Sequence, residues 1–370
     1  MGSVSPVVLA LNSGSSSLKF GLYRVGPSGL DVLMSGDVDL KVTDGAPSAL
    51  RLIAGRLAAA KTPPPTAIGH RVVHGGPALR DHCRIDEAVL GQLAAATPFS
   101  PLHMPTALSL IRCAHEHFGD LPQVACFDTV FHAGMPEVAR TLPIAKALRS
   151  EGLERYGFHG LSCESIVLRL GEDLPDRLII AHLGNGASIT AVKAGKSIDT
   201  SMGLTPTGGV IMGTRSGDLD PGILVYLARE KAFDPAMLET LVDRRSGLLG
   251  ISGIDSDMRS LRRMAPSNAD ARLAIRMFCY SVRRHVVGMI AALEGVDMIV
   301  FTGGIGENDA LAREEICAGL TWMGITLDQA RNRSGDNPLD HAGSRCRVLV
   351  LASQEDEQIA RHVAELTADD

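Results

Sequence analysis

The chain has 370 residues, a length that suggests two or three domains rather than one. Thirty-six basic and 42 acidic side chains give a formal net charge of −6, which argues against a nucleic-acid binder, because such a protein needs a basic surface. With 45% hydrophobic and 21% charged residues, the chain can build packed cores and is not intrinsically disordered.

Signals for membrane insertion or export are not expected in this sequence. No window approaches the ~18–20 apolar residues of a membrane helix. Residues 1–6 lack the basic start and apolar stretch of a signal peptide. The seven cysteines are odd in number, widely spaced and without a C-x-x-C pair, so reduced thiols are expected rather than disulfides or a zinc site. We therefore expect a soluble, cytoplasmic protein.

The N-terminal region is predicted to form two strands joined by a polar turn. Residues 7–11 are apolar, residues 12–17 are turn formers, and residues 18–23 alternate between apolar and other side chains. The same succession returns at residues 178–192, around a glycine-rich turn at 182–186. This repetition hints at a duplicated architecture.

Further strands and helices alternate along the chain. Apolar residues 123–126 end just before Asp128, which places that carboxylate at a strand end, where open α/β sheets put ligands. Helices are predicted at residues 221–230 and 269–293, and an α/β fold class follows. The second helix is amphipathic, with an expected apolar stripe that contains Leu273, Met277, Tyr280, Val287 and Ile290.

A late strand is followed by another glycine-rich turn. Residues 296–301 are apolar, residues 302–306 are expected to turn sharply, and Asn308 or Asp309 can cap the helix that follows. Each of the three turns exposes backbone N–H groups that suit a phosphate, although each alone could be a mere hairpin turn. Their coincidence favours a nucleotide site.

The standard nucleotide-binding fingerprints do not fit these turns. A Walker loop ending at Ser197 needs a glycine where Thr190 stands. The two later turns lack the last glycine of a dinucleotide-binding loop and have Ile189 and Asp309 instead. The chain is therefore expected to use a different phosphate cradle.

Two arginines and one histidine lie between small residues. Arg71 and Arg215 are flanked by glycine-rich segments, which lets a planar anion approach the guanidinium, although a plain surface arginine would also fit. His159 has glycines on both sides, which favours an exposed functional histidine at least as much as a core one. A metal pair formed by His70 and His74 is disfavoured.

Seven blocks, taken in order, resemble the signatures of acetate kinases and span nearly the whole chain. They are ALNSGSSSLK at residues 10–19, GHRVVHGG at 69–76, FDTVFH at 127–132, YGFHG at 156–160, HLGNGAS at 182–188, MGTRSGDLDPG at 212–222 and FTGGIGEN at 301–308.

The resemblance implies the two-domain fold of actin, sugar kinases and heat-shock ATPases, with duplicated ribonuclease H-like domains and nucleotide in a cleft. Because the C-terminal segment of such folds returns to the first domain, we expect one domain at residues 1–149 plus 352–370 and another at 150–351. Family members are homodimers that move a phosphoryl group between ATP and a short carboxylate, giving ADP and an acyl phosphate, with Mg²⁺ (or Mn²⁺). Neither nucleic acid nor membrane is an expected partner.

The charged residues on which the assignment of roles relies are all present. By resemblance, Asn12 and Glu355 position the Mg²⁺ ion. Arg71 and Arg215 hold the carboxylate and the migrating phosphoryl group. His159 and Asp128 lie beside them, and His182 lies near the β-phosphate. Transfer is expected to be direct and in line, without a phosphoenzyme or a general base.

The remaining implied roles concern nucleotide and substrate binding. The segments around ATP are Ser15, Ser17 and Lys19 in the first hairpin, His182, Leu183, Gly184, Asn185 and Gly186 in the second, and Asp257, Met258, Arg259, Gly304, Ile305, Gly306, Glu307 and Asn308 around the adenosine. Val73, Leu102, Phe158 and Pro206 wall the methyl pocket beside Arg71.

Departures from the family pattern concern substrate preference more than reaction type. Met104 stands where an asparagine is common, Cys163 where a second histidine is common, and residues 207–209 replace a bulkier stretch. A propionate or other short-chain carboxylate kinase therefore remains an alternative. A non-catalytic ATP-binding regulator of the same fold is a remote one, because it would have lost an arginine or His159.

Overall fold

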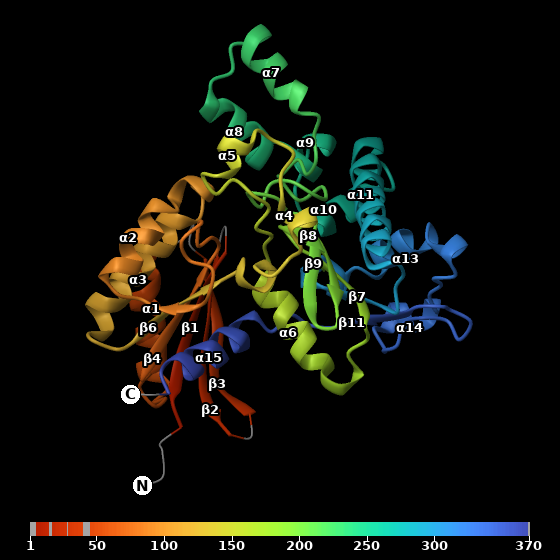
Figure 1. Ribbon diagram of the computed structural model, residues 1–370. Helices are drawn as coiled ribbons and strands as arrows, with labels where there is room; N and C mark the ends of the chain where they lie inside the picture. The colour runs from red at the N-terminus through yellow and green to blue at the C-terminus, as the bar shows by residue number, and fades with distance from the viewer. Residues whose placement is uncertain (1–4, 15–16, 28, 40–44, 369–370) are drawn as a thin grey trace. The chain divides into compact units, whose positions relative to one another are not determined.

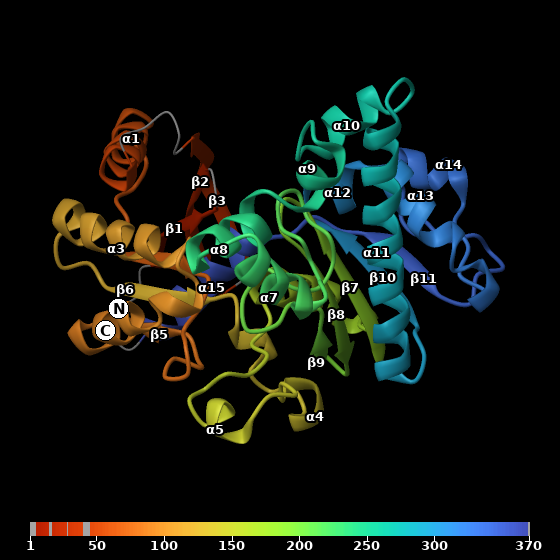
Figure 2. The same cartoon turned by 90° about the horizontal axis from the view of Figure 1, so that it is seen from above.

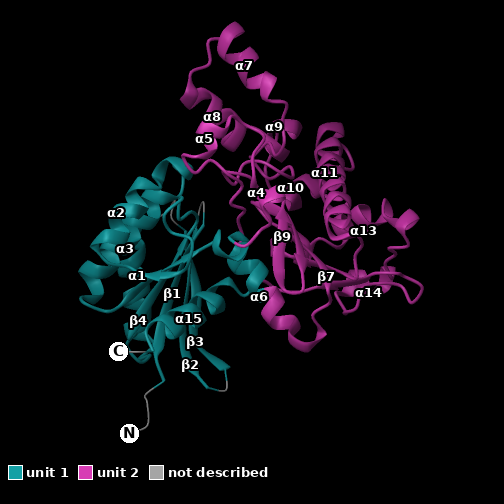
Figure 3. Cartoon of the chain, viewed as in Figure 1, with its two compact units in different colours: residues 1–133, 160–165, 354–370 teal, residues 134–159, 166–353 magenta. Residues whose placement is uncertain are grey.

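The structure is a computed structural model that describes residues 5–14, 17–27, 29–39 and 45–368 (Figure 1). The chain divides into two compact units, each built on its own mixed β-sheet (Figure 3). This arrangement confirms the predicted α/β class. Unit 1 comprises Met1–Ala133, Gly160–Ser165 and Gln354–Asp370, and unit 2 comprises Gly134–His159 and Ile166–Ser353.

Unit 1 has a six-stranded sheet in the order β3-β2-β1-β4-β6-β5. Strands β1, β2 and β3 are antiparallel neighbours, whereas β1, β4 and β6 run parallel. The elements are β1 (Val7–Ser13), β2 (Ser17–Gly26), β3 (Gly29–Asp39), α1 (Gly45–Ala59), β4 (Ala67–Val72), β5 (Cys83–Arg84), α2 (Glu87–Ala95), α3 (Met104–Phe118), β6 (Gln123–Phe127), the start of α6 (Gly160–Leu170) and α15 (Glu355–Leu366).

The side chains of β1 alternate between two cores, as the period of a strand requires. Leu9 and Leu11 pack with α1 and α3, whereas Val8 and Ala10 pack with Ile359 and its neighbours on α15. The C-terminal helix is therefore a structural part of unit 1, and it brings Glu355 to this sheet.

Unit 2 repeats the strand arrangement of unit 1. Its sheet has the order β11-β10-β7-β8-β9, in which β7, β8 and β9 are antiparallel and β7, β10 and β11 are parallel. The hinted duplication is thus visible in the two sheets. The strands are β7 (Arg177–Leu183), β8 (Ala187–Lys193), β9 (Lys196–Thr200), β10 (Met298–Thr302) and β11 (Arg347–Val350).

Helix α11 packs against β7, β8 and β9 of its own unit (Figure 2). The helices of unit 2 are the rest of α6, α4 (Glu137–Arg140), α5 (Lys146–Arg149), α7 (Pro221–Glu230), α8 (Pro235–Arg244), α9 (Gly247–Ser252), α10 (Met258–Met264), α11 (Ala269–Leu293), α12 (Gly303–Asn308), α13 (Ala310–Ala318) and α14 (Gln329–Ser334).

The predicted bounds of α7 and α11 are confirmed, but the predicted apolar stripe of α11 is wrong in part. Ile290 is buried as predicted and Val287 is half-buried, but Leu273, Met277 and Tyr280 are exposed. The buried face there includes Ala274, Phe278 and Val282. Because α11 carries apolar side chains around much of its circumference, more than one face could pack on the sheet, and apolar character alone does not reveal which one is buried.

The predicted turn at residues 302–306 is also wrong in part. The chain does change direction at Gly303, whose φ is +76° and where a Cβ would lie 2.8 Å from the carbonyl oxygen of Leu183. From there, however, Gly303–Asn308 forms helix α12. Asp309 caps the following helix by accepting from the N–H of Ala312, as predicted.

The limits of the compact units differ from the expected domain limits, which were 1–149 with 352–370 for one domain and 150–351 for the other. The expected domain limits stay a prediction. Residues 134–149 belong to unit 2, where Arg155 donates from Nε to the carbonyl oxygen of Ala139 at 3.0 Å. Among the residues that the structure describes, no helix combines the length and apolar character needed to cross a membrane.

Candidate active site

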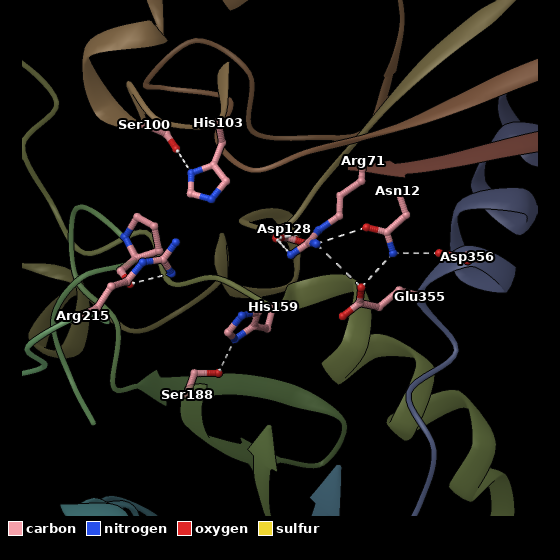
Figure 4. A network of polar contacts seen from close by, with 11 residues as sticks. Asn12, Arg71, Ser100, His103, Asp128, His159, Ser188, Arg215, Glu355 and Asp356 are labelled. Atoms are coloured by element: carbon pink, nitrogen blue, oxygen red, sulfur yellow. Dashed lines mark hydrogen bonds and ion pairs between the residues drawn. The ribbon is translucent and has the colours of Figure 1, made fainter. Parts of the chain in front are cut away.

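Half-buried Arg71 and buried Asp128 form an ion pair in unit 1 (Figure 4). They lie at the ends of the parallel neighbours β4 and β6. Arg71 donates from Nε to both carboxylate oxygens at 3.1 and 3.0 Å, and from Nη2 to Oδ2 at 2.6 Å. Burial raises the pKa of Asp128, and Arg71 opposes that rise. Burial disfavours the charge on Arg71, but Asp128 and Glu355 outweigh it and raise its pKa. Each of the two side chains is therefore stabilised in its charged form by the opposite charge of the other.

The carboxamide of Asn12 joins this pair to the start of α15. Its Oδ1 accepts from Nη1 of Arg71 at 3.1 Å. Its Nδ2 donates to Oε2 of Glu355 at 3.0 Å and to Oδ1 of Asp356 at 2.7 Å. Both N–H groups of the amide are thereby used, so the orientation of the Asn12 side chain is set by the network.

Two adjacent carboxylates begin α15. Nη1 of Arg71 lies 3.9 Å from Oε2 of Glu355. Burial raises the pKa of Asp356, and the hydrogen bond from Asn12 opposes that rise. Carboxylate and carboxamide oxygens are the ligands that Mg²⁺ prefers, so Asn12, Glu355 and Asp356 are suitable residue types for a magnesium site. In this structure the Asn12 amide presents Nδ2 to both carboxylates, and its oxygen accepts from Arg71.

The first predicted phosphate hairpin is the β1–β2 connection. Lys19 lies opposite Asn12 in the register of these strands, is exposed, and acts electrostatically on Asp356. The N–H of Gly14 donates to the carbonyl oxygen of Ser17 at 2.8 Å, which closes the turn. Ser15 lies outside the described residues.

The residues of the predicted methyl pocket in unit 1 differ in burial. Val73 is buried and Leu102 is half-buried. Met104, the departure from the family pattern, is fully buried and packs in a core cluster with Phe127. Any effect of Met104 on acyl preference would therefore act through the packing of the core.

In unit 2, His159 is held in an uncommon backbone conformation at the start of α6. Its φ is +59°, a left-handed value that a residue with a Cβ adopts at some cost. The buried imidazole has Nδ1 3.0 Å from Oγ of Ser188 and stacks on His182, with ring centroids 4.2 Å apart. His159 thus packs against His182 and Ser188 of the second hairpin.

Arg215 approaches the same hairpin within unit 2. A Cβ placed on Gly186 would lie 3.4 Å from Nη1 of Arg215 and 3.1 Å from Nε2 of His159. The guanidinium donates to the carbonyl oxygen of Pro206 at 3.3 Å (Figure 4). The structure therefore gathers four predicted residues, His159, His182, Gly186 and Arg215, around one turn.

The remaining predicted nucleotide segments also lie in unit 2. The hairpin turn is closed by the N–H of Gly184, which donates to the carbonyl oxygen of Gly186 at 3.0 Å. Asp257 caps α10, and its hydrogen bond with the exposed Arg259 holds the pKa of Asp257 at about 2. The side chains of Leu183 and Met258 are buried, whereas Asn185, Gly304, Ile305, Glu307 and Asn308 are half-buried or exposed. Phe158, predicted for the methyl pocket, is buried as well.

His70 is a buried neutral histidine on β4, with Nε2 2.6 Å from Oε1 of Gln123. Burial lowers its pKa to about 4, and the bond with Gln123 opposes this shift. As the pH falls from about 6.5 towards 4, the unfolded chain takes up this proton and the folded chain does not. The folded state therefore loses stability over this window, by about 3 kcal/mol for this group.

We expect His70→Gln to flatten the fall in the free energy of unfolding between pH 6.5 and pH 4. Urea denaturation at several pH values measures this slope. His117→Gln, which changes an exposed histidine on α3, is the control and should leave the slope as it is. An unchanged slope in His70→Gln would contradict the assignment.

A second polar cluster of unit 1 consists of His82, Glu164 and His362, whose candidate ligand atoms lie within 4.8 Å of one another. Oε2 of Glu164 lies 2.8 Å from Nε2 of His362 and 4.0 Å from Nε2 of His82. The N–H of Phe127 donates to Nδ1 of His82 at 3.0 Å. Neutral His82 therefore carries its proton on Nε2, where a metal ion would need a lone pair, so a hydrogen-bonded cluster fits better than a metal centre.

Sequence analysis missed Asp356 and Ser188 as members of the site. Both lie inside recognised segments: Asp356 directly follows Glu355, and Ser188 ends the HLGNGAS block. Ser188 could have been suspected because it follows His182 by six residues across a tight hairpin. No local pattern indicates that Asp356 would meet Asn12.

This chain is similar to known proteins over nearly its whole length. A family model described as "Acetokinase family" matches residues 48–361. An acetate kinase from Methylocella silvestris is 39% identical, with 98% of each chain covered. Among solved structures, a propionate kinase from Francisella tularensis has 34% identity and a TM-score of 0.91, and an acetate kinase from Porphyromonas gingivalis has 34% identity and a TM-score of 0.87. Each covers 98% of this chain and is itself covered completely. These likenesses confirm the predicted two-domain kinase fold.

Proposed function

Because this chain belongs to the acetokinase family, we propose that it is an acetate kinase, a phosphotransferase with a carboxyl group as acceptor. The reaction is the reversible transfer of the γ-phosphoryl group of ATP to acetate, which gives acetyl phosphate and ADP. The observation that carries the proposal is the match to acetate kinases over 98% of the chain.

The charges at the candidate site suit the substrates. Acetate and the phosphates of ATP repel each other, so cations are needed to hold them together. Arg71 and Arg215 provide guanidinium groups that bind carboxylate and phosphoryl oxygens through paired N–H donors. In the transition state the migrating group carries charge on three equatorial oxygens, and these donors stabilise it.

The acceptor oxygen needs no general base. Acetate is ionised at neutral pH, so its carboxylate can attack phosphorus directly. We assign Asp128 the task of orienting Arg71, because all of its described side-chain bonds run to that guanidinium. We assign His159 to the phosphoryl group, with His182 and Ser188 fixing its ring.

Asn12, Glu355 and Asp356 would hold Mg²⁺, with Mn²⁺ as a possible substitute. A bound divalent ion supplies positive charge that neutralises the phosphate oxygens. Lys19 and the backbone N–H groups of the two hairpins bind the phosphates, and the residues of α10 and α12 border the adenosine. In the cell we place the enzyme in the cytoplasm, as a homodimer.

Trapping of the product tests this function. Wild-type protein incubated with ATP, Mg²⁺ and acetate in the presence of hydroxylamine is expected to form acetohydroxamate and an equal amount of ADP. Omission of Mg²⁺ should abolish the signal. If neither acetate nor any other short acid gave a trapped acyl group, the result would contradict the proposed function.

Propionate is the second candidate acceptor, because one similar solved structure is a propionate kinase. One methylene in an apolar pocket changes binding by only about 1–3 kcal/mol, so preference has to be measured. We expect the ratio kcat/KM to be highest for acetate, lower for propionate and lowest for butyrate. A reversed order would make the chain a propionate kinase without changing the reaction type.

A further inference from the structure

The carboxylate of Glu307 accepts hydrogen bonds from backbone N–H groups of the protein itself. Its Oε1 accepts from the N–H of Gly303 at 3.0 Å and from the N–H of Ser353 at 3.1 Å, and lies 3.5 Å from Oγ1 of Thr302. Gly303 begins α12, and Ser353 follows β11. One oxygen atom thus holds two segments that are 50 residues apart in sequence.

Ser353 is the last residue of unit 2 before the chain passes to unit 1. The next amide, that of Gln354, donates to Oγ of Ser165 at 3.2 Å within unit 1. Glu355, the first residue of α15, follows directly. The crossover is therefore fixed on each side by a side chain, and Glu307 provides the bond on the unit 2 side.

The other end of α12 is held by Arg313, which is almost completely buried. Its Nη1 donates to the carbonyl oxygens of Gly306 at 2.8 Å and Glu307 at 2.9 Å. Nε and Nη2 donate to Oδ1 and the carbonyl oxygen of Asn332. Carbonyl groups at the end of a helix, which lack partners in the helix, are thereby satisfied. Helix α12 is therefore held by charged side chains at both ends.

We propose that Glu307 is a positioning residue that fixes the nucleotide segment Gly303–Asn308 relative to the strand that leads to Glu355, rather than a group that contacts ATP. This inference rests on the proposed function, since it takes α12 to border the adenosine and Glu355 to hold Mg²⁺. What matters in this role is the reach of an acceptor oxygen to two amides. The negative charge itself is secondary.

Two conservative substitutions separate reach from charge. Glu307→Gln keeps an acceptor oxygen at the same reach but loses the charge, whereas Glu307→Asp keeps the charge on a side chain one methylene shorter. We expect Glu307→Asp to raise the KM for MgATP about tenfold and Glu307→Gln less than about threefold, with the KM for acetate changed less than about twofold in both. Glu314→Gln, the same change of charge on α13, is the control. A larger loss in Glu307→Gln than in Glu307→Asp would overturn the proposal in favour of direct contact with the ligand.

Hydrogen exchange of the nucleotide-free protein tests the same bonds without any reaction. Peptides that contain the Gly303 and Ser353 amides are expected to exchange about tenfold faster in Glu307→Asp than in wild type or in Glu307→Gln. Equal exchange in all three proteins would overturn the proposal. Failure of wild type to form an acyl phosphate would instead refute the proposed function, while the exchange result would still decide whether Glu307 holds the two segments.

Discussion

Replacement of Arg71 by alanine is expected to lower turnover by about 10²–10³, because it removes a guanidinium that we propose stabilises the charge of the migrating phosphoryl group. The loss should appear in kcat with ATP, Mg²⁺ and saturating acetate. Stability should fall as well, since breaking a buried ion pair costs about 3–5 kcal/mol when its partner stays buried. In this case the partner is Asp128, which is 1% exposed.

A double variant separates the two effects of Arg71. Arg71→Ala combined with Asp128→Ala removes the stranded carboxylate, so the free energy of unfolding should recover part of the loss. Turnover should stay low, because the missing cation is not replaced. Recovery of turnover in the double variant would mean that Arg71 serves only to neutralise Asp128, which contradicts the assigned role.

Arg215→Ala is expected to reduce turnover by a similar factor of about 10²–10³ with a smaller change in stability. One hydrogen bond of the guanidinium runs to the neutral carbonyl oxygen of Pro206, so its loss leaves no unpaired charge at that acceptor. Turnover and urea denaturation, measured on the same preparation, check both parts of this expectation.

Chemical rescue provides the control for Arg215. Added guanidinium ion should restore part of the turnover of Arg215→Ala and none of that lost by Glu355→Ala. Arg229→Ala, which removes an exposed arginine of α7, should behave as wild type. Near-normal turnover in a folded Arg215→Ala protein would show that Arg215 has no role in catalysis.

The elements that the sequence predicts best are those with strong local signals. Strands β1 and β7 are apolar runs, and turn residues separate each of them from the next strand, β2 or β8. Helices α7 and α11 carry a helical period with clear ends. Helix α12 was predicted as a turn because its residues 303, 304 and 306 are glycines. Its helical form depends on Arg313 and Glu307, whose bonds the glycine pattern does not reveal.

Long-range contacts explain what the sequence could not predict about the site. Asn12 meets Asp356 across 344 residues of chain, and Arg71 meets Asp128 across 57. The resemblance placed Asn12, Arg71, Asp128 and Glu355 at one site, and the structure brings these four side chains together in unit 1. It could not indicate that Asn12 uses its whole carboxamide within the protein, nor that Glu307 is bonded to two backbone amides.

The account depends most on both arginines acting on one phosphoryl group. The most direct measurement is a crystal structure of the protein with MgADP, acetate and a planar fluoride mimic of the migrating phosphoryl group. We predict that N–H groups of Arg71 and of Arg215 both lie within hydrogen-bonding distance of the mimic. A complex in which either guanidinium is turned away from it would contradict the account.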